Sequence, residues 1–499
     1  MSETVSVVVP TLDNPVLLAE CVASLRKLDY PADKVEIVVA DNGSKERTAE
    51  MLRSRYPKVR HIKLGSNTGF VGACNRGASE ASGEYVAFIN DDAVAEPGWL
   101  EGLFAGLEAG GEGTVCAAAH IRSQDGREVE FSGASANLFG VGRPRSVWGW
   151  PGSLETPGLG TPLLFASGGA MLIQRRTFLD VGGFDPHFFA YFEDVDLGWR
   201  LWALGYKVAY APGAVVRHIG GATGSRAGAH RRYVLWESNS LATVLKNYES
   251  GNMERILSAA LLLLYKRALL SAGEAFDPAE YRLGGRPDTN TANVEALPRI
   301  SVAHLAAIDR FNSLLPRFME ERRTIQARRV RSDAEIVPLL GRAFEPQFAG
   351  SEYARAAGQL ASAMGLYGIT AEAAPNRVLV LASMGEEEAA REVAARLKEH
   401  ALVALALLSD GPAAEQRDEG GVAVHYLNRS DPALRGLVEQ ADGLVALPGV
   451  LGHPALAGTA SPIAVVGEAR GAGMTEHTLT FSAADEEGLL AFCREPYFV

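Results

Sequence analysis

The first part of the chain alternates short apolar, β-branched runs with stretches of helical periodicity. The runs at 5–10, 35–40, 59–64 and 85–90 have the length and composition of buried strands, and the segments between them place apolar residues at helical spacing. Strands that alternate with helices are typical of a mostly parallel sheet that helices cover on both faces. We therefore expect an α/β domain over residues 1–230.

The pattern changes twice after this domain. Residues 231–350 have helical periodicity, and from Arg377 strands and helices alternate again. We therefore expect a helical region followed by a smaller α/β domain over 376–499, which resembles one half of a Rossmann-type pair. Within the first domain, two further short strands are expected at 207–210 and 214–217.

Composition and charge narrow the class of protein. The chain has 499 residues, of which 47% are hydrophobic and 22% charged, so it is expected to form more than one soluble domain. A formal net charge of -12 argues against a general nucleic-acid binder, which would carry a basic stripe. The four cysteines form no CxxC pair, so we expect neither a disulfide framework nor a zinc site. The first residues lack the basic region of a signal peptide, and we expect a cytoplasmic protein.

Two segments leave contact with a membrane surface open. The apolar stretch Ile256–Leu264 is too short to span a bilayer, and it is either a buried helix or a helix that lies on the inner face of the cell membrane. The basic run 317–331 is either a solvated helix face or a contact surface for anionic lipid or a diphosphate-linked acceptor. The sequence leaves oligomerisation open as well.

A buried strand that ends in acidic residues is the most informative feature. The apolar run from Tyr85 leads directly into Asn90, Asp91 and Asp92, at the kind of strand end where open α/β sheets bind ligands. Carboxylate and carboxamide oxygens there suit Mg²⁺ or Mn²⁺, which neutralises a diphosphate. His218 follows a later strand and would complete a metal site. A motif of this kind on its own is more often an acidic turn in contact with solvent. The polar residues that follow the other strands favour a ligand site instead.

Polar residues also follow the other three predicted strands. Asp13 comes after the first, Asp41 and Asn42 after the second, and Asn67 and Gly69 after the third. Each is a usual turn residue, but a parallel sheet would gather all of them at one edge. A nucleotide needs such groups, because a carboxylate can bind its base or ribose and glycines let the backbone approach closely. The sequence therefore predicts a nucleotide site at this edge.

A second acidic cluster lies at 191–200. Glu193, Asp194 and Asp196 fall in the first turn of a predicted helix, where the macrodipole favours ionised carboxylates. An ionised carboxylate suits a general base, and a helix-capping role is an equally common explanation. Asp196 and Arg200 have the spacing of an ordinary surface ion pair.

Six segments between residues 5 and 250 carry a family resemblance. They are PTLDN (10–14), VVADNGS (38–44), NTGFVGACNRG (67–77), YVAFINDDAVAEPGWL (85–100), ASGGAMLIQRRTFLDVGGFDPHFFAYFEDVDLGWRLWALGYKVAY (166–210) and RHIGGATG (217–224). In order and register they resemble family 2 glycosyltransferases, and within them the rhamnosyltransferase-like branch of cell-surface polysaccharide synthesis.

This resemblance implies a GT-A fold, a UDP- or dTDP-linked sugar donor, a glycan or lipid-linked acceptor, Mn²⁺ or Mg²⁺, and inversion at the anomeric carbon. It implies that Asp194 takes the proton from the acceptor hydroxyl, that Glu193 positions the acceptor, and that Asp92 and His218 bind the metal. By position, the donor-binding residues would be Pro10, Thr11, Asp13, Asp41, Asn42, Asn67, Gly69, Gly72, Asn75, Asn90, Asp91, Trp199 and Arg200. The acceptor-side residues would be Ser167, Gly168 and Gly169.

The chain departs from the family pattern at Asn90, where the family often has aspartate. Which of the two remaining carboxylates contacts the metal directly stays open. The stretch 303–344 resembles the linker of longer glycosyltransferases in which a GT-B module follows, and residues 376–470 resemble only the N-terminal half of that module. We therefore expect the C-terminal domain to be non-catalytic.

Two other functions compete with this interpretation. One is a non-catalytic scaffold that binds sugar nucleotides. The other is a sugar nucleotidyltransferase, which usually carries a glycine-rich, arginine-containing loop after the first strand. Residues 11–15 of this chain, Thr-Leu-Asp-Asn-Pro, lack that pattern.

Overall fold

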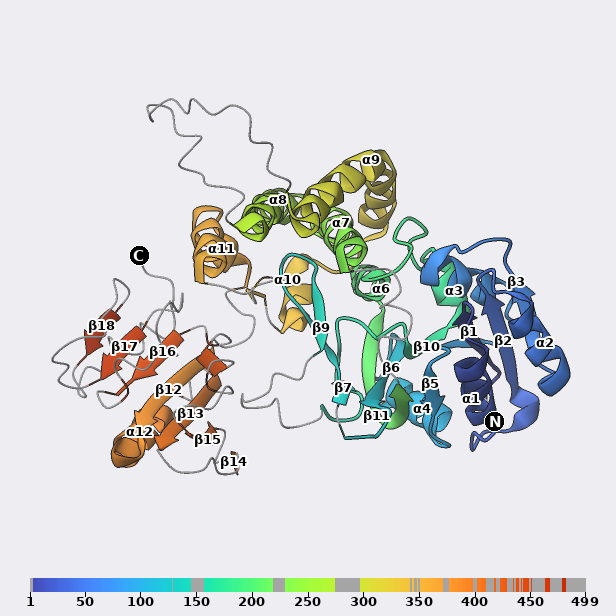
Figure 1. Cartoon of the computed structure of the whole chain (residues 1–499), viewed down its shortest axis with the longest axis horizontal. Coiled ribbons are helices and arrows are strands. Elements are labelled where there is room, and N and C mark those ends of the chain that lie inside the picture. Colours follow the sequence, from blue (N-terminus) through green and yellow to red (C-terminus); the bar gives the residue numbers. More distant parts are fainter. Residues whose placement is uncertain are drawn as a thin grey trace. The chain divides into compact units, whose positions relative to one another are not determined.

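The chain forms two compact units. The computed structural model describes residues 3–127, 129–144, 157–218, 229–273 and 297–341, together with most of 343–370 and the main helices and strands from there to 481. One unit consists of Met1–Arg145 and Pro157–Ala343, and the other of Ser146–Thr156 and Phe344–Val499. Figure 1 labels the elements of both units.

The first unit is built on a mixed sheet, which confirms the predicted α/β class. Its strands follow the order β3-β2-β1-β4-β10-β6-β11-β5, with β7 beside β6. The four strands expected at the start of the chain are β1 (Val5–Thr11), β2 (Val35–Asp41), β3 (Arg60–Lys63) and β4 (Tyr85–Ile89). They pair in parallel, with Val5 opposite both Val35 and Tyr85, so their carboxyl ends meet at one edge of the sheet.

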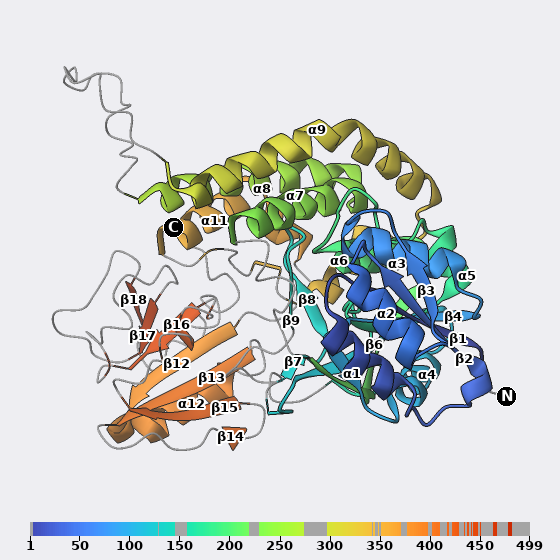
Figure 2. The ribbon, with the colours of Figure 1, turned by 45° about the vertical axis from the view of Figure 1, so that its right-hand side comes forward.

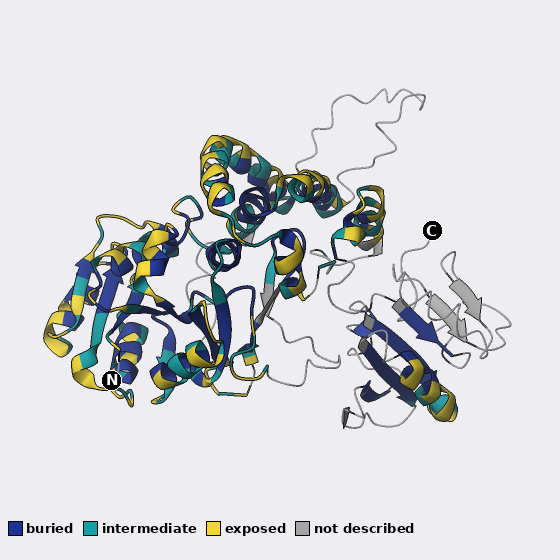
Figure 3. Cartoon of the chain, turned by 180° about the vertical axis from the view of Figure 1, so that it is seen from behind, coloured by how far each residue is buried: buried dark blue, intermediate teal, exposed yellow. Residues whose placement is uncertain are grey.

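Helices connect these strands and cover the sheet. They are α1 (Pro15–Leu25), α2 (Glu46–Arg55), α3 (Gly69–Glu80) and α4 (Trp99–Ala109). Val7, Val8 and Phe88 on the strands are fully buried, as a sheet covered on both faces requires. Figure 3 shows the central strands almost entirely in the colour of buried residues.

The second half of the sheet contains strands of both directions. Its strands are β5 (Ala93–Ala95), β6 (Thr114–Ser123), β7 (Val129–Phe131), β10 (Ala170–Gln174) and β11 (Lys207–His218). β10 runs antiparallel to both β4 and β6, whereas β11 runs parallel to β6 and antiparallel to β5. A small hairpin of β8 (Ala134–Ala136) and β9 (Gly142–Pro144) and the helices α5 (Arg175–Asp180) and α6 (Glu193–Ala203) complete this part.

The prediction of two short strands at 207–210 and 214–217 was wrong, because β11 is continuous across them. The register against β6 shifts between Ala211 and Val215, so the Pro212–Gly213 pair bends the strand without ending it. The continuous strand carries His218 at its end.

A helical layer follows within the same unit. It consists of α7 (Ala229–Asn247), α8 (Ser250–Ala272), α9 (Arg299–Arg328) and the short α10 (Asp333–Ile336). Figure 2 shows α7, α8 and α9 side by side. Ile256, Leu263 and Leu264 of the apolar stretch 256–264 are buried, whereas Leu262 is 47% exposed, so one face of this helix packs against the protein and the other does not. None of the helices in the described parts of the chain is long and apolar enough to cross a membrane.

Three arginines at 322–331 cap helices. Arg322 donates hydrogen bonds to the backbone carbonyls of Leu245 and Tyr248 at the end of α7, and Arg329 donates to the carbonyl of Asn247. Arg331 donates to the carbonyl of Trp202 in the last turn of α6 and to those of Gly205 and Tyr206 just after it. The last carbonyls of a helix have no partner within the helix, so these side chains stabilise both helix ends. These three arginines therefore form neither a solvated helix face nor a contact surface for anionic lipid or a diphosphate-linked acceptor.

The second unit contains a seven-stranded sheet in the order β14-β15-β13-β12-β16-β17-β18. As the smaller α/β domain expected over 376–499 requires, the strands β12 (Arg377–Ser383), β13 (Leu402–Ser409), β15 (Val422–Asn428), β16 (Gly443–Ala446) and β17 (Ile463–Val466) pair in parallel. The remaining elements are β14 (Arg417–Asp418), β18 (Thr478–Phe481), α11 (Ser351–Ala363) and α12 (Glu387–Leu397).

Candidate active site

The carboxyl ends of β1, β2 and β4 bring several predicted donor-side residues together. Thr11, which follows Pro10 at the end of β1, lies in register with Asp41 at the end of β2. The Thr11 hydroxyl donates a hydrogen bond of 2.6 Å to Asp91 Oδ2, just beyond the end of β4. The parallel register therefore joins these side chains into one polar edge.

Ser44 links the two carboxylates predicted to hold the nucleoside. Its backbone N–H donates to Asp41 Oδ1 at 2.7 Å, and its Oγ accepts from the backbone N–H of Asp13 at 2.9 Å. Asp41 Oδ2 lies 3.0 Å from His61 Nε2. Asp41 is fully buried, whereas Asp13 is exposed and has a left-handed φ of 52°. Asp13 is therefore the carboxylate that this edge presents to solvent, and Asp41 shapes the loop beneath it.

The side chain of Asn42 fixes the loop after β3. Its Oδ1 accepts from the backbone N–H and the hydroxyl of Thr68, and its Nδ2 donates to Asn67 Oδ1 and to the carbonyl of Gly69. Gly69 has a φ of 76°, and a Cβ there would lie 2.2 Å from the carbonyl oxygen of Phe189. Only glycine fits this approach of two loops.

Two further predicted donor-side residues pack within the fold near α3. Asn75 exchanges hydrogen bonds with the backbone N–H and carbonyl of Phe184. A Cβ on Gly72 would lie 2.3 Å from Thr68 Oγ1, so Gly72 leaves room for the loop itself. The polar atoms of Asn75 are therefore used inside the protein.

Trp199 and Arg200, expected to line the donor pocket, lie in the interior instead. Trp199 is fully buried. Arg200 is 5% exposed and donates to Asp196 Oδ2 and to the carbonyls of Val181 and Gly183. The Asp196–Arg200 pair forms as its spacing indicates, but it is buried rather than at the surface. These contacts direct the guanidinium into the core. We therefore do not include Trp199 or Arg200 in the proposed active site.

The ends of β4 and β11 place His218 between two carboxylates. His218 Nε2 lies 3.0 Å from Asp92 Oδ1, and Nδ1 lies 2.8 Å from Glu130 Oε2. Asn90 Nδ2 is 3.4 Å from the same Nε2. Burial lowers the pKa of His218, but the Asp92 and Glu130 carboxylates outweigh it and raise the pKa to about 9.

This donor set fits a divalent cation. Asp92 is only 3% exposed, and its Oδ1, although close to His218, makes no hydrogen bond of good geometry to any residue that the structure describes. Glu130 orients the imidazole through Nδ1, and Nε2, which faces Asp92, would release its proton on binding a metal ion. Asp91 Oδ2 already accepts from Thr11, so Asp92 is the better candidate for a direct ligand. An imidazole nitrogen beside carboxylate oxygens suits Mn²⁺, and carboxylate oxygens suit Mg²⁺.

Glu193 and Asp194 begin α6, as the sequence predicts. Asp194 Oδ2 accepts from the backbone N–H of Gly168 at 3.2 Å, and Oδ1 accepts from the N–H of Val195 at 2.9 Å. Burial raises the pKa of Asp194 to about 6, although these N–H groups lower it. Burial and the neighbouring Asp194 raise the pKa of Glu193 well above its usual range. Asp194 is therefore the member of the pair that carries the negative charge at neutral pH.

The segment Ser167–Gly169 joins the two polar clusters. The carbonyl of Gly169 accepts a hydrogen bond of 3.1 Å from the N–H of Asn90, while the N–H of Gly168 holds Asp194. A Cβ on Gly169 would lie 3.0 Å from Asn90 Nδ2. Ser167 Oγ accepts from the N–H of Gly169 at 3.3 Å. The carboxylate of Asp194 and the acidic end of β4 are thus bound to the same short segment.

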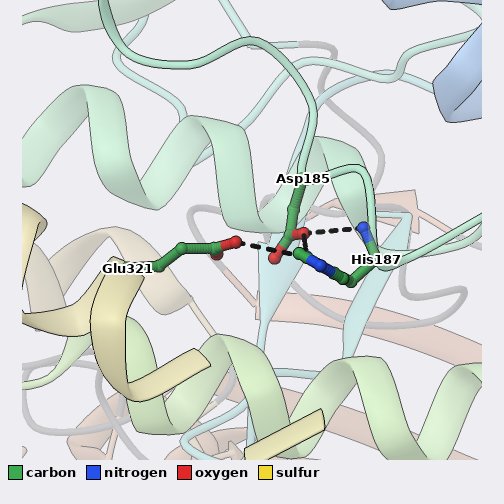
Figure 4. A group of neighbouring side chains, drawn as sticks. All are labelled: Asp185, His187 and Glu321. Carbon is green, nitrogen blue, oxygen red and sulfur yellow. Dashed lines mark hydrogen bonds and ion pairs between the residues drawn. The ribbon is translucent and has the colours of Figure 1, made fainter. Parts of the chain in front are cut away.

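A second group of side chains has the composition of a metal site. Asp185, His187 and Glu321 place ligand atoms within 4.8 Å of one another, as Figure 4 shows. The fully buried ammonium of Lys246 contacts Asp185 and lies 3.1 Å from Glu321 Oε2. Because this ammonium already lies against both carboxylates and compensates part of their charge, we assign no metal to the group.

Sequence reasoning missed Glu130. It lies in a region with few regular elements, and no motif marks it. The available signal was its position between Val129 and Phe131, an apolar–polar alternation typical of a strand.

Comparisons with known proteins place the first part of the chain in a family. Residues 6–182 match the family model of Glycosyl transferase family 2. The N-acetylglucosaminyl-diphospho-decaprenol L-rhamnosyltransferase of Mycobacterium tuberculosis (strain CDC 1551 / Oshkosh) is 32% identical in an alignment of 208 residues, which covers 37% of this chain and 66% of that protein. The O-antigen biosynthesis protein RfbC of Myxococcus xanthus is 30% identical over 213 residues, which are 41% of this chain and 16% of that protein. The alignments thus span just under two thirds of the first relative and a small part of the second.

Among solved structures, GalNAc-T7 with UDP, GalNAc and Mn²⁺ aligns with a TM-score of 0.42 at 20% identity, over 52% of this chain and 50% of that one. A likeness of this size carries no functional assignment. These comparisons show a glycosyl transferase family 2 domain over residues 6–182, which include the acidic end of β4 but not Asp194 or His218.

Proposed function

We propose that the first unit is an inverting, metal-dependent glycosyltransferase. It would move a sugar from a UDP- or dTDP-linked donor to a hydroxyl of a glycan or lipid-linked acceptor in cell-surface polysaccharide synthesis. The observation that carries this proposal is the segment Gly168–Gly169, which binds Asp194 through one residue and the end of β4 through the next. A base and a diphosphate site on either side of one segment are what an in-line displacement needs.

Asp194 is the proposed general base. Its carboxylate is held by two backbone N–H groups and keeps its remaining lone pairs for the acceptor hydroxyl, whose proton it takes. Glu193 is buried and its Oε2 has no hydrogen-bond partner among the described residues. In its protonated form this carboxyl would donate a hydrogen bond to the acceptor and so orient it.

Asp92 and His218 would hold Mn²⁺ or Mg²⁺, with Glu130 orienting the imidazole. A bound divalent ion neutralises charge on the leaving diphosphate. Asn90 and Asp91 lie beside these ligands, and the exposed Asp13 at the same sheet edge would contact the nucleoside. For the second unit we propose a non-catalytic role in acceptor binding or assembly. A cytoplasmic location and contact with the inner face of the membrane remain predictions.

The proposal is tested by a transfer assay. The full chain is incubated with UDP- and dTDP-linked sugars and an N-acetylglucosaminyl-diphospho-prenol acceptor, with Mn²⁺ or with a chelator, and the anomeric configuration of the product is read by NMR. We expect transfer that the chelator abolishes and a product of inverted configuration. Retention of configuration would contradict the role of Asp194. Nucleotide binding without transfer for any donor and acceptor would favour the scaffold.

A further inference from the structure

The residues directly before the proposed base have an unusual backbone. Phe189, Tyr191 and Phe192 have φ values of 67°, 71° and 63°, in the left-handed region that non-glycine residues rarely adopt. Phe192 is the residue that precedes the first turn of α6, so its backbone sets the direction in which Glu193 and Asp194 enter the helix. A backbone of this kind persists only where surrounding contacts hold it.

One side chain of α7 supplies three of those contacts. Asn239 Nδ2 lies 3.1, 3.0 and 2.8 Å from the carbonyl oxygens of Phe188, Ala190 and Tyr191, to which it donates. Its Oδ1 accepts from Arg310 Nη1 at 3.0 Å, which fixes the orientation of the amide. Asn239 is fully buried, and nothing in the predicted donor, acceptor or metal sets includes it.

The same segment is also held by α3, which carries several of the predicted donor-binding residues. The carbonyl of Phe189 accepts a hydrogen bond of 3.1 Å from the N–H of Val71, in the first turn of α3. Gly69, at the start of α3, leaves the space that this approach requires. The left-handed segment therefore lies between α3 and α7, and Asn239 bonds the carbonyls that α3 does not reach.

We propose that Asn239 is a positioning residue for sugar transfer. It holds the segment 188–192 in its left-handed form, so that the Asp194 carboxylate points at the acceptor hydroxyl. This inference rests on the proposed function. A positioning role differs from a purely structural role in one measurable respect. A variant of Asn239 that still folds should bind nucleotide normally and fail in the chemical step.

The test compares Asn239→Leu with wild type. Leucine has a similar volume and donates no hydrogen bond, and Asn312→Leu at an exposed position of α9 is the matched control. Arg310→Met is the second variant: it keeps the amide of Asn239 but removes the hydrogen bonds of Arg310 to Asn239 Oδ1, to Ser238 Oγ and to the carbonyl of His187. The measurements are kcat and KM for the donor well below the melting temperature, the Kd of UDP and dTDP with Mn²⁺, and amide hydrogen exchange of residues 188–195.

For Asn239→Leu we expect kcat to fall about 10²-fold, the loss typical of a small misplacement of reacting groups. Donor KM and nucleotide Kd should stay within about twofold, as for a loss confined to the transition state. Hydrogen exchange should rise in 188–195, and the control should match wild type in every measurement. Unchanged exchange in this segment, or a folded Asn239→Leu with wild-type kcat, would overturn the inference. A wild type that transfers no sugar would overturn the proposed function instead, and the exchange experiment would still report on the segment.

Discussion

Asp194 and Asp196 lie on the same turn of α6, and replacing each by asparagine should have opposite consequences. Asparagine keeps the shape of the side chain and removes the negative charge. We expect Asp194→Asn to abolish sugar transfer without destabilising the folded protein. Asp196→Asn should weaken the fold.

The expected loss of transfer for Asp194→Asn is about 10²–10⁴-fold, the usual contribution of general base catalysis. Its effect on stability follows from the raised pKa. The pKa of Asp194 rises from an ordinary value of 3.8 to about 6 in the folded protein. The folded state therefore binds the extra proton between these pH values, and stability falls as pH rises through that window.

A difference of about 2 pKa units corresponds to at most ~3 kcal/mol of destabilisation by the ionised Asp194 at neutral pH. The asparagine variant removes this cost and loses one of the two hydrogen bonds from Gly168 and Val195, worth about 1 kcal/mol. We therefore expect Asp194→Asn to be at least as stable as wild type at pH 7.5.

Asp196 has the opposite environment. It is fully buried, with Arg200 Nε at 2.8 Å and Lys246 Nζ at 3.0 Å. Removing its charge leaves two buried cations with less compensation, and breaking a buried ion pair in this way costs about 3–5 kcal/mol. Urea unfolding at pH 7.5 gives both stabilities, and the transfer assay gives both rates. Asp194→Asn with wild-type transfer, or Asp196→Asn as stable as Asp194→Asn, would refute the reasoning.

Three further predictions concern the same unit. Transfer by wild type should fall as pH drops through about 6, because Asp194 takes up a proton there and no longer acts as a base; a flat profile from pH 5 to 8 would contradict this. Glu130→Gln should raise the Mn²⁺ concentration needed for half-maximal transfer about 10–100-fold, since Glu130 orients His218; an unchanged metal titration would exclude that role. Lys246→Met should destabilise the protein by about 3–5 kcal/mol, because it leaves Asp185, Asp196 and Glu321 without their shared ammonium; an unfolding midpoint equal to wild type would argue against it.

The sheet and its polar edge could be predicted because they follow local rules. Buried parallel strands are continuous apolar runs, and the residues after them fall at one edge whatever the rest of the chain does. Asp13, Asp41 and the 90–92 motif could therefore be placed together from the strand pattern alone. The resemblance to family 2 glycosyltransferases assigned roles in the same site to Asp194 and His218, which lie far from these residues in the sequence.

Other features depend on long-range contacts that no local pattern reveals. Arg200 has the spacing of a surface pair, yet α7 covers it and makes the pair a buried one. The arginines at 322–331 have the composition of a basic surface, but three of them satisfy helix carbonyls. Asn239 carries no motif, because its role comes from the backbone shape of a loop distant in sequence.

The most direct test of the central claim, that metal and base occupy two sides of one active site, is nucleotide binding measured by calorimetry. UDP and dTDP are titrated with and without Mn²⁺ into wild type, Asp92→Ala and Asp194→Asn. We predict metal-dependent binding of one nucleotide to wild type and to Asp194→Asn, and its loss in Asp92→Ala. Equal binding to all three proteins, or binding that is lost in Asp194→Asn and kept in Asp92→Ala, would contradict the account.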